Sequence, residues 1–406
     1  MSIDHAKPSA LNHLRILDLA DERGMFCSKL LADMGADVIR IEKPRGDNPG
    51  RRRGPFLRDS INGKASLFYW YHNTNKRCIT LNLGRKQGRS ILERLIQTAD
   101  AIVETYTDKQ LYKLGLDWNT LHMQYPSMIV TSITDFGRTG PRKDFISCDL
   151  VSSALGGQMY ISGQSDSPPL KPYGEQTHLV ASLFGAIGIL LAIQQRHVSR
   201  TGQHVDISIH ECTAATIEPV NVQYFYEGII TKRQSPLHWN SAFRVFPCRD
   251  GHILISLFQQ WDTLIEWLDS EGMAQDLNGE KWQQQENRLR EVDHVIEVIE
   301  QWTKQHSVDE LVEQGQLMRF PWAPVQSIEQ VAHDPQLKTR GFFTEVYHPE
   351  LGKYFTYPGA PYKFSESPWQ LHHRAPLLGE HNPTIYCQEL GISQQEFKEL
   401  AVKGII

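Results

Sequence analysis

The sequence predicts an α/β protein whose largest domain is a parallel sheet with helices on both faces. Residues 14–19 (LRILDL) form a short apolar run of β type, residues 26–34 carry apolar side chains at helical spacing, and residues 38–41 alternate like a strand. Residues 78–104 repeat the order strand, helix, strand, and residues 128–133 add another apolar run of strand length. Strands that alternate with helices build parallel sheets, in which ligands bind at the carboxyl ends of the strands.

The middle of the chain has a different character. Residues 225–325 combine a hairpin-like stretch at 243–257 with amphipathic helices such as 292–302, which predicts a smaller α+β domain. Residues 341–362 are rich in glycine, proline and aromatic side chains, and a final helix follows them. A chain of 406 residues is long enough for two or three such domains.

The charge balance gives no sign of a polyanionic partner. The chain carries 42 basic and 47 acidic side chains, a net charge of −5. A protein with this balance has no global attraction to nucleic acid or to an anionic membrane, so any anion site must be local.

Apolar runs and cysteines indicate the compartment. Residues 1–12 lack the apolar core of a signal peptide. The run 179–193 falls short of the roughly 20 residues that a membrane-spanning helix needs, so we expect a buried helix there and no membrane partner. The six cysteines show no CxxC pair, which is typical of a reducing compartment. These features predict a cytoplasmic protein.

Histidine and glycine motifs do not predict a metal or a nucleotide loop. The spacing of His204 and His210 would place both on one face of a strand, but no second cluster, HExxH or CxxC completes a ligand set. Ordinary packing is therefore the favoured interpretation, and no metal is predicted. Gly156 and Gly157 lack the spacings of dinucleotide and P-loop motifs, which favours tight packing or a turn.

The segment 43–53, KPRGDNPGRRR, gathers five basic residues beside glycine and proline. Three interpretations are open: a solvated surface loop, a site for phosphate groups, and a nucleic-acid patch. The last is disfavoured because no interleaved aromatic side chains or known binding module accompany the charges.

Six blocks of the chain, in order and with matching spacing, resemble the family III CoA-transferases, also called the CaiB/BaiF family. The blocks are LLADMGADVIRIEKPRGD at 30–47, YHNTNKRCITLNL at 71–83, SITDFGRTGP at 132–141, CDLVSSALGGQMYISG at 148–163, RTGQHVDIS at 200–208 and RAPLLGEHN at 374–382. The resemblance runs nearly end to end.

The resemblance implies a large Rossmann-like domain built from both chain ends, with a small domain between them. The expected layout is residues 1–210 for the first part of the large domain, 225–325 for the small α+β domain and 330–406 for the part that returns to the large domain. It also implies two subunits threaded through each other as an interlocked dimer, either a homodimer or a heteromer with a second family III subunit.

The same resemblance implies that the chain binds coenzyme A, as an acyl-CoA substrate, near the first strand-helix-strand unit. The residues expected at the CoA site are Lys43, Arg51, Leu81, Thr105, Tyr106 and Lys113. CoA carries a ribose 3′-phosphate and a pyrophosphate, which call for lysine or arginine donors.

The reaction is harder to predict than the fold, because the family's nucleophilic aspartate has no counterpart. In the family this aspartate stands ten residues before the glycine that matches Gly188, and here that position is His178. Covalent CoA transfer needs a carboxylate that can carry first the acyl group and then CoA. An imidazole has no carbonyl on which to hold CoA. It does suit acid-base chemistry, and packing at a helix start is its other interpretation.

Two carboxylates near this position are the remaining candidates. Glu175, three residues earlier, would be displaced by about 10 Å and point to the opposite face if the segment were extended, which favours a structural role over a nucleophilic one. Asp149 either lines the site or caps a helix. Cys148 stands where the racemases of the superfamily place a histidine, which argues against their arrangement of two bases.

Three functions therefore remain open. The first is a CoA-transferase that moves CoA between an acyl-CoA donor and a carboxylic acid. The second is a subunit without a nucleophile in a heteromeric transferase whose partner supplies the aspartate. The third is acid-base chemistry on a CoA thioester (dehydration, lyase action or epimerisation) by His178 and Asp149.

Overall fold

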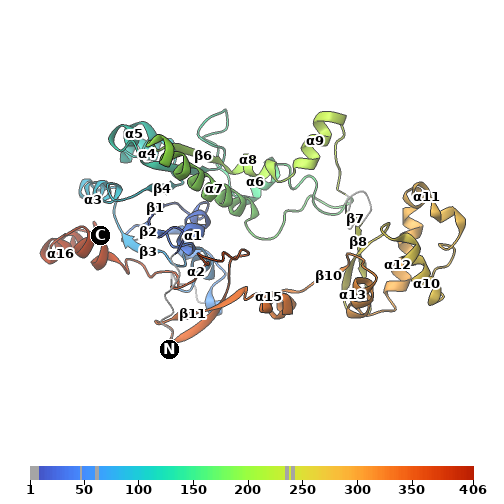
Figure 1. Cartoon of the computed structure of the whole chain (residues 1–406). Coiled ribbons are helices and arrows are strands. Elements are labelled where there is room, and N and C mark those ends of the chain that lie inside the picture. Colours follow the sequence, from blue (N-terminus) through green and yellow to red (C-terminus); the bar gives the residue numbers. More distant parts are fainter. Residues whose placement is uncertain (1–8, 46–47, 60–63, 234–236, 239–242) are drawn as a thin grey trace. The chain divides into compact units, whose positions relative to one another are not determined.

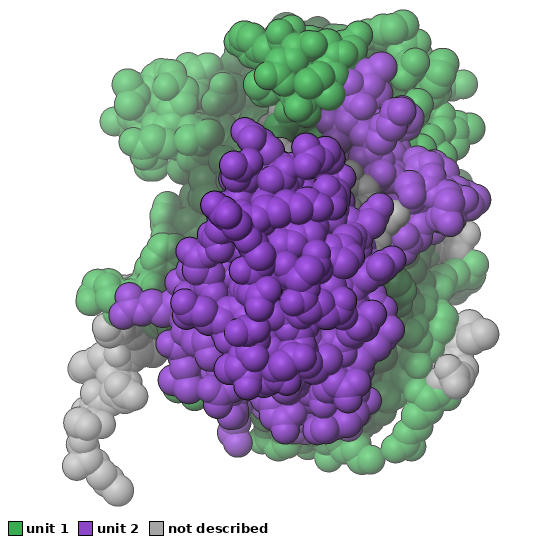
Figure 2. Space-filling model, turned by 90° about the vertical axis from the view of Figure 1, so that its right-hand side faces the viewer, with its two compact units in different colours: residues 1–158, 171–229, 339–406 green, residues 159–170, 230–338 purple. Residues whose placement is uncertain are grey.

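The computed structural model describes residues 9–45, 48–59, 64–233, 237–238 and 243–406. These residues divide into two compact units (Figure 2). Unit 1 is Met1–Gln158, Lys171–Ile229 and Thr339–Ile406, and unit 2 is Met159–Leu170 and Ile230–Lys338.

Unit 1 is built on a six-stranded sheet in which every neighbouring pair is parallel, as the sequence predicts. The order is β3-β2-β1-β4-β5-β6. The strands are β1 (Arg15–Leu19), β2 (Asp37–Glu42), β3 (Arg77–Thr80), β4 (Ala101–Glu104), β5 (Ile129–Thr134) and β6 (His204–Ser208). This is the strand order of doubly wound dinucleotide-binding folds.

Helices cover both faces of this sheet (Figure 1). The α-helices of unit 1 are α1 (Met25–Asp33), α2 (Leu67–His72), α3 (Lys86–Ile96), α4 (Asp108–Leu114), α5 (Trp118–Gln124), α6 (Asp149–Leu155), α7 (Gln176–Ser199), α8 (Ile209–Ala215), α9 (Glu218–Glu227) and α16 (Gln394–Val402). A π-helical turn spans Pro383–Glu389, and β11 (Phe343–His348) pairs antiparallel with β12 (Lys353–Pro358).

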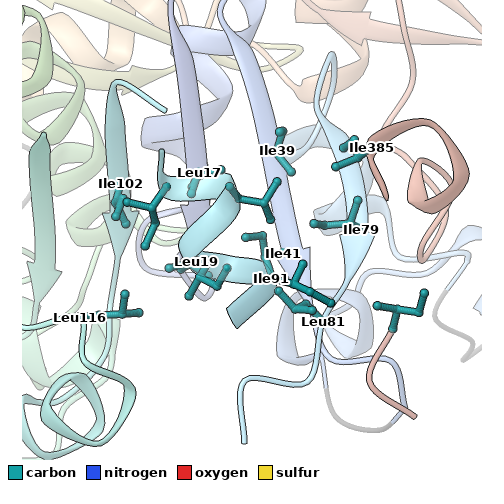
Figure 3. Close-up of a cluster of buried hydrophobic side chains, with 14 of the residues drawn as sticks. Leu17, Leu19, Ile39, Ile41, Ile79, Leu81, Ile91, Ile102, Leu116 and Ile385 are labelled. Carbon is teal, nitrogen blue, oxygen red and sulfur yellow. The ribbon is translucent and has the colours of Figure 1, made fainter. Parts of the chain in front are cut away.

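One face of the sheet is covered by α3, α4 and α5 together with the C-terminal segment. Ile385 lies beside Ile79 of β3 in this cluster (Figure 3). Leu400 and Ile405 join the same core, and the amide of Asn82 donates to the Ile405 carbonyl. The last residues of the chain therefore complete a core that its first hundred residues begin (Figure 1).

The other face is covered by α1, α7 and α8. Helix α7 contains the apolar run 179–193 and buries Ala181 and Ile189 against the sheet, as predicted for one face of the helix. The prediction of a fully buried helix is wrong, because the opposite face of the same run is exposed at Leu183, Phe184, Ile187, Leu190 and Leu191. A Cβ atom at Gly188 would lie 2.6 Å from a methyl group of Val205, so any larger residue would force that side chain to shift. By length and composition α7 is also the one helix among the described residues that could cross a membrane, and half of its most apolar window is buried.

Unit 2 combines an antiparallel sheet of order β10-β9-β8-β7 with a helical layer. The predicted hairpin is confirmed, with β8 paired antiparallel to β9. Its strands are β7 (Leu237–His238), β8 (Phe243–Pro247), β9 (His252–Ser256) and β10 (Ala323–Pro324). Its α-helices are α10 (Trp261–Ser270), α11 (Gln285–Arg290), α12 (Val292–Thr303), α13 (Val308–Leu317), α14 (Ile328–His333) and α15 (Pro335–Thr339). Trp282, Trp302 and Trp322 are fully buried in its core.

A network of buried charges joins the first two strands of unit 1 to the segment before β3. Asp18 of β1 is fully buried and accepts from Lys76 at 2.9 Å, from Arg40 of β2 at 2.9 Å and from Ser28 at 2.7 Å. Burial raises the pKa of Asp18, but the two cations and the hydrogen bonds outweigh it and hold the pKa below its ordinary value. The carboxylate is therefore charged and fully coordinated.

We expect Lys76→Met to lower the free energy of unfolding by about 3 to 5 kcal/mol, because it leaves the Asp18 carboxylate buried with only one of its two cations. Lys86→Met, at the exposed start of α3, is the matched control and should change stability by about 0.5 kcal/mol or less. Chemical denaturation of both variants measures the difference. Equal unfolding midpoints would show that the network does not stabilise the fold.

Candidate active site

A cavity of about 410 Å³ lies at the carboxyl ends of the central strands of unit 1. Its lining includes Asp21 and Arg23 after β1, Thr105 and Tyr106 after β4, and Asp135 after β5. The chain leaves β1 and β4 toward opposite edges of the sheet, and ligands of open parallel sheets bind at this switch point.

The N-termini of α6 and α7 form the remaining wall. Asp149, the first residue of α6, accepts hydrogen bonds from the backbone amide of Thr177 at 3.1 Å and from its hydroxyl at 2.8 Å. This contact holds the two helix starts side by side. Cys148 and His178, the neighbours of the bonded pair, both line the cavity.

His178 lies in the first turn of α7 and is 5% exposed. No described residue forms a hydrogen bond with either of its ring nitrogens. Its Nδ1 atom is 3.4 Å from a carboxylate oxygen of Glu175, but the two groups are not aligned for a hydrogen bond. Burial is the main reason that the pKa of His178 lies below its ordinary value, so the imidazole is neutral at pH 7.

Glu175 is closer to His178 than the sequence predicts, and the extended geometry expected for this segment is wrong. Glu175 is the N-cap residue of α7, so the chain already turns into the helix here. Residues three apart on a helix are neighbours, which replaces the expected separation of about 10 Å by a contact. The other oxygen of Glu175 is paired with Arg53.

Asp149 both lines the cavity and fixes the wall, so the two interpretations of this residue are not exclusive. Its second oxygen is paired with the Lys171 ammonium at 2.6 Å. Burial raises the pKa of Asp149, but the hydrogen bonds from Lys171 and Thr177 together lower it by more than burial raises it. The pKa of Asp149 therefore lies below its ordinary value. Both oxygens are occupied, which leaves none free to attack a substrate.

Several residues of this cavity were missed by the sequence reasoning. Arg23 bonds Asp21 and pairs with Asp135 at 3.0 Å, and the other oxygen of Asp135 is buried without a partner. Arg138 donates to the Tyr106 carbonyl at 2.7 Å, and its Nε is also buried without a partner. The signal was present in the sequence, because Asp21, Asp135 and Arg138 closely follow predicted strands.

The residues predicted at the CoA site are not all in one place. Thr105 and Tyr106 line the cavity, where Thr105 accepts from the Asp21 amide at 2.9 Å and burial raises the pKa of Tyr106 to about 12. Lys43, just after β2, and Lys113, in the last turn of α4, are exposed and lie outside its lining. They remain candidates for phosphate contacts.

Arg51 and Leu81 are placed differently from that prediction. Arg51 is 6% exposed, and its guanidinium donates to Glu42 at 2.7 Å, to the Tyr69 hydroxyl at 2.7 Å and to the Pro376 carbonyl at 3.0 Å. A guanidinium occupied in this way belongs to the buried network and is not free for a phosphate. The side chain of Leu81 is 1% exposed in the core and so presents no face to a ligand.

The histidine and glycine motifs behave as packing residues. His204 in β6 is hydrogen-bonded to Ser132 at 2.8 Å, whereas His210 belongs to α8, so the expected common strand face does not exist. Groups that could hold a metal are absent from the described part of the chain. A Cβ atom at Gly156 would lie 2.5 Å from Thr213, which is tight packing at the end of α6.

The sequence of this chain matches the model of CoA-transferase family III over residues 11–382. The chain belongs to this family. It is 32% identical over 404 residues to the succinyl-CoA:(R)-benzylsuccinate CoA-transferase subunit BbsE of Thauera aromatica, covering 97% of this chain and 98% of that protein. It is 34% identical over 395 residues to succinyl-CoA:mesaconate CoA-transferase of Haloarcula hispanica, covering 94% and 97%.

A solved structure supports the family assignment of the fold. The crystal structure of a CaiB/BaiF family protein from Brucella suis is similar to this chain with a TM-score of 0.83 and 28% identity, over 94% of this chain and 99% of that one. The family III resemblance carried by the six sequence blocks is therefore confirmed, as is the α/β class with its parallel sheet.

We expect Arg53→Gln to raise the pKa of His178. The substitution removes a cation that disfavours the imidazolium, and it releases the Glu175 carboxylate to face the ring. Titration of the His178 ring protons by NMR measures the change. Arg142→Gln, at an exposed position, is the control and should leave the pKa where it is. A lower pKa in Arg53→Gln would contradict this account of the site.

Proposed function

We propose that the chain is a CoA-transferase subunit that binds an acyl-CoA and takes part in moving CoA between that donor and a carboxylic acid, with a second family III subunit supplying the nucleophilic carboxylate. Family membership and the CoA-transferase relatives support the general activity. One relative is a subunit of a benzylsuccinate CoA-transferase, which favours a heteromeric assembly, and for this assembly we propose the interlocked arrangement expected of the family.

One observation supports the proposal of a partner subunit. The position of the family nucleophile holds a neutral imidazole, and the carboxylates around it are paired with cations of this chain. Lys171 and Thr177 occupy Asp149, and Arg53 holds one oxygen of Glu175. Arg23 holds one oxygen of Asp135, while the other is buried. A nucleophile must approach a thioester carbon to about 3 to 3.5 Å. Carboxylates held in this way are poorly placed for that approach.

The chemistry needs a carboxylate because two groups must be carried in turn. The carboxylate oxygen attacks the thioester carbonyl, the carbon–sulfur bond breaks, and the CoA thiolate leaves behind a mixed anhydride. The thiolate then attacks the anhydride at the carbonyl of the enzyme residue, and the substrate acid departs. The residues of this chain would orient the thioester and keep water out of the cavity while the partner carries out these steps.

A second candidate is acid-base chemistry on a bound CoA thioester. The observation that favours it is the neutral, buried His178 with two unpartnered nitrogens, because a neutral imidazole can remove a proton adjacent to a thioester carbonyl. Exchange of the α-protons of an acyl-CoA with deuterated solvent, lost in His178→Gln, would favour this function over transfer.

We expect CoA to stabilise the chain against heat, since a ligand at about 100 times its dissociation constant adds roughly 2.7 kcal/mol. Replacing Lys43 or Lys113 with methionine should weaken the binding of CoA, whereas the control Lys86→Met, at an exposed position, should not. Calorimetry that finds no binding of CoA or of an acyl-CoA at millimolar ligand would end the CoA-handling proposal.

We expect no CoA transfer by the isolated wild-type chain and measurable transfer by His178→Asp, because that substitution returns a carboxylate to the nucleophile position. Mass spectrometry of acyl-CoA products with a second carboxylic acid is the measurement, and Glu175→Gln is the companion variant. If wild type alone transfers CoA and Glu175→Gln abolishes the activity, Glu175 is the nucleophile and no partner is needed. If His178→Asp gains nothing, the acid-base candidate becomes the better one.

A further inference from the structure

Cys148 is the one exposed thiol in the chain, whose six cysteines all lie among the described residues. Three of the others are buried and two are partly buried. Cys148 lines the cavity of the candidate active site. It is also the N-cap residue of α6, and its side chain makes no capping hydrogen bond. Its sulfur is therefore both accessible and uncommitted.

Four of the other cysteines, Cys27, Cys78, Cys212 and Cys248, are poor nucleophiles because burial raises their pKa. Burial raises the pKa of Cys212 and of Cys248 to about 11 in each case, and it raises the pKa of Cys78 to about 12. A thiolate is the reactive form of cysteine, so thiols held protonated in apolar surroundings are inert.

A proton acceptor for Cys148 is present in the same cavity. The Asp149–Thr177 contact holds the start of α6 against the start of α7, and Cys148 and His178 flank that contact on the cavity side. His178 is 5% exposed, and no described residue binds either of its nitrogens. A buried polar group without a partner costs free energy, so its presence at a cavity points to a group that arrives with a ligand or a reaction.

Burial keeps His178 neutral, and its charged neighbours act on its pKa in both directions. Asp149 and Asp135 favour the imidazolium, Arg53 and Arg23 disfavour it, and burial outweighs them all. A carboxylate oxygen of Glu175, the N-cap residue at the start of α7, lies 3.4 Å from Nδ1. A neutral imidazole with a free nitrogen is what a cysteine needs as a base.

We propose that Cys148 is an acyl-accepting nucleophile and that His178 is its general base. This inference rests on the proposed function in one respect, that a CoA thioester is the substrate. His178 takes the proton from the Cys148 thiol, and the thiolate attacks the thioester carbonyl. The carbon–sulfur bond to CoA breaks, and the departing CoA thiolate takes the proton back from His178. The acyl group is then a thioester on Cys148, and CoA is released as a free thiol.

Energetics support this exchange. One thioester is replaced by another, so the step is close to thermoneutral and reversible, and no oxidant or further reactant is required. A second CoA molecule can recover the acyl group by the reverse steps. The activity is therefore acyl exchange between thiols, which differs from the CoA transfer to a carboxylic acid that the family carries out.

The experiment uses the full chain with two acyl donors, acetyl-CoA and S-acetyl-N-acetylcysteamine, the second of which lacks the nucleotide. After acid quenching, peptide mass mapping should place acetyl groups on Cys148 in the wild type, removable by neutral hydroxylamine. We expect no mark at this position in Cys148→Ser and roughly 100-fold slower marking in His178→Gln, the typical effect of losing a general base. Cys387→Ser is the control and should be marked like wild type.

Two further readouts make the outcomes distinct. Exchange of isotopically labelled CoA into acetyl-CoA should require Cys148 and His178, and thermal unfolding confirms that both variants are folded. Calorimetry with desulfo-CoA, which has no thiol, measures binding apart from chemistry. If desulfo-CoA binds but Cys148 is unmarked by either donor, or is marked equally fast in His178→Gln, the inference is wrong and the proposed function stands. If S-acetyl-N-acetylcysteamine marks Cys148 in a His178-dependent way while no CoA compound binds, the roles of Cys148 and His178 toward thioesters stand, and CoA as the substrate and the CoA proposal both fail.

Discussion

The divergence of the chain at the centre of the parallel sheet is the constraint on which the site depends. Strand β1 is followed by β2 and β3 on one side, whereas β4, β5 and β6 extend the sheet on the other. The loops after β1 and β4 must therefore part, and the space between them has no helix of its own to fill it. The side chains at these loop starts, from Asp21 to Arg23 and from Thr105 to Tyr106, become cavity walls for this reason.

Charge pairing explains how so polar a cavity is compatible with a stable fold. Around Asp18, buried carboxylates and cations are matched within the protein, and the same holds at the cavity for Arg23 with Asp135 and for Lys171 with Asp149. Burial of an ion costs much less when an opposite charge lies beside it. His178 avoids this cost, since burial keeps it uncharged.

How much could be predicted from the sequence differs between the sheet and the site. The five strands of the first 134 residues and the helices α1 and α3 follow apolar periodicity, which reports burial directly, and they were predicted in the correct order and type, whereas the short helices α2, α4 and α5 were not predicted. Site residues depend on details that periodicity does not carry. The predicted separation of Glu175 from His178 was wrong because it depended on where α7 begins. In an extended backbone the two residues would be about 10 Å apart, whereas at the start of a helix their side chains are in contact.

Arg51 shows the complementary difficulty. In the sequence it is one of three consecutive arginines in a loop rich in glycine and proline, a setting that indicates solvent or phosphate. In the structure the ring of Tyr69 lies 3.9 Å below its guanidinium, and Glu42 holds it from β2. Of the three arginines, Arg51 is the buried one because α2 and the loop at Pro376 pack against it. This tertiary packing cannot be predicted from the local sequence pattern.

The charge distribution also limits how a CoA thioester could lie on this chain. The cations that line the cavity are mostly paired with carboxylates, so the cavity offers little net attraction for the phosphates of CoA. By contrast, Lys43 and Lys113 are exposed and form no ion pair with a carboxylate among the described residues. On the proposed function we expect the nucleotide to stay at these outer lysines. The uncharged pantetheine arm would then be the part that enters the cavity, and it would bring the thioester to the wall that Cys148 and His178 line. A neutral imidazole suits that end of the ligand, because a thioester carbonyl carries no charge until it is attacked.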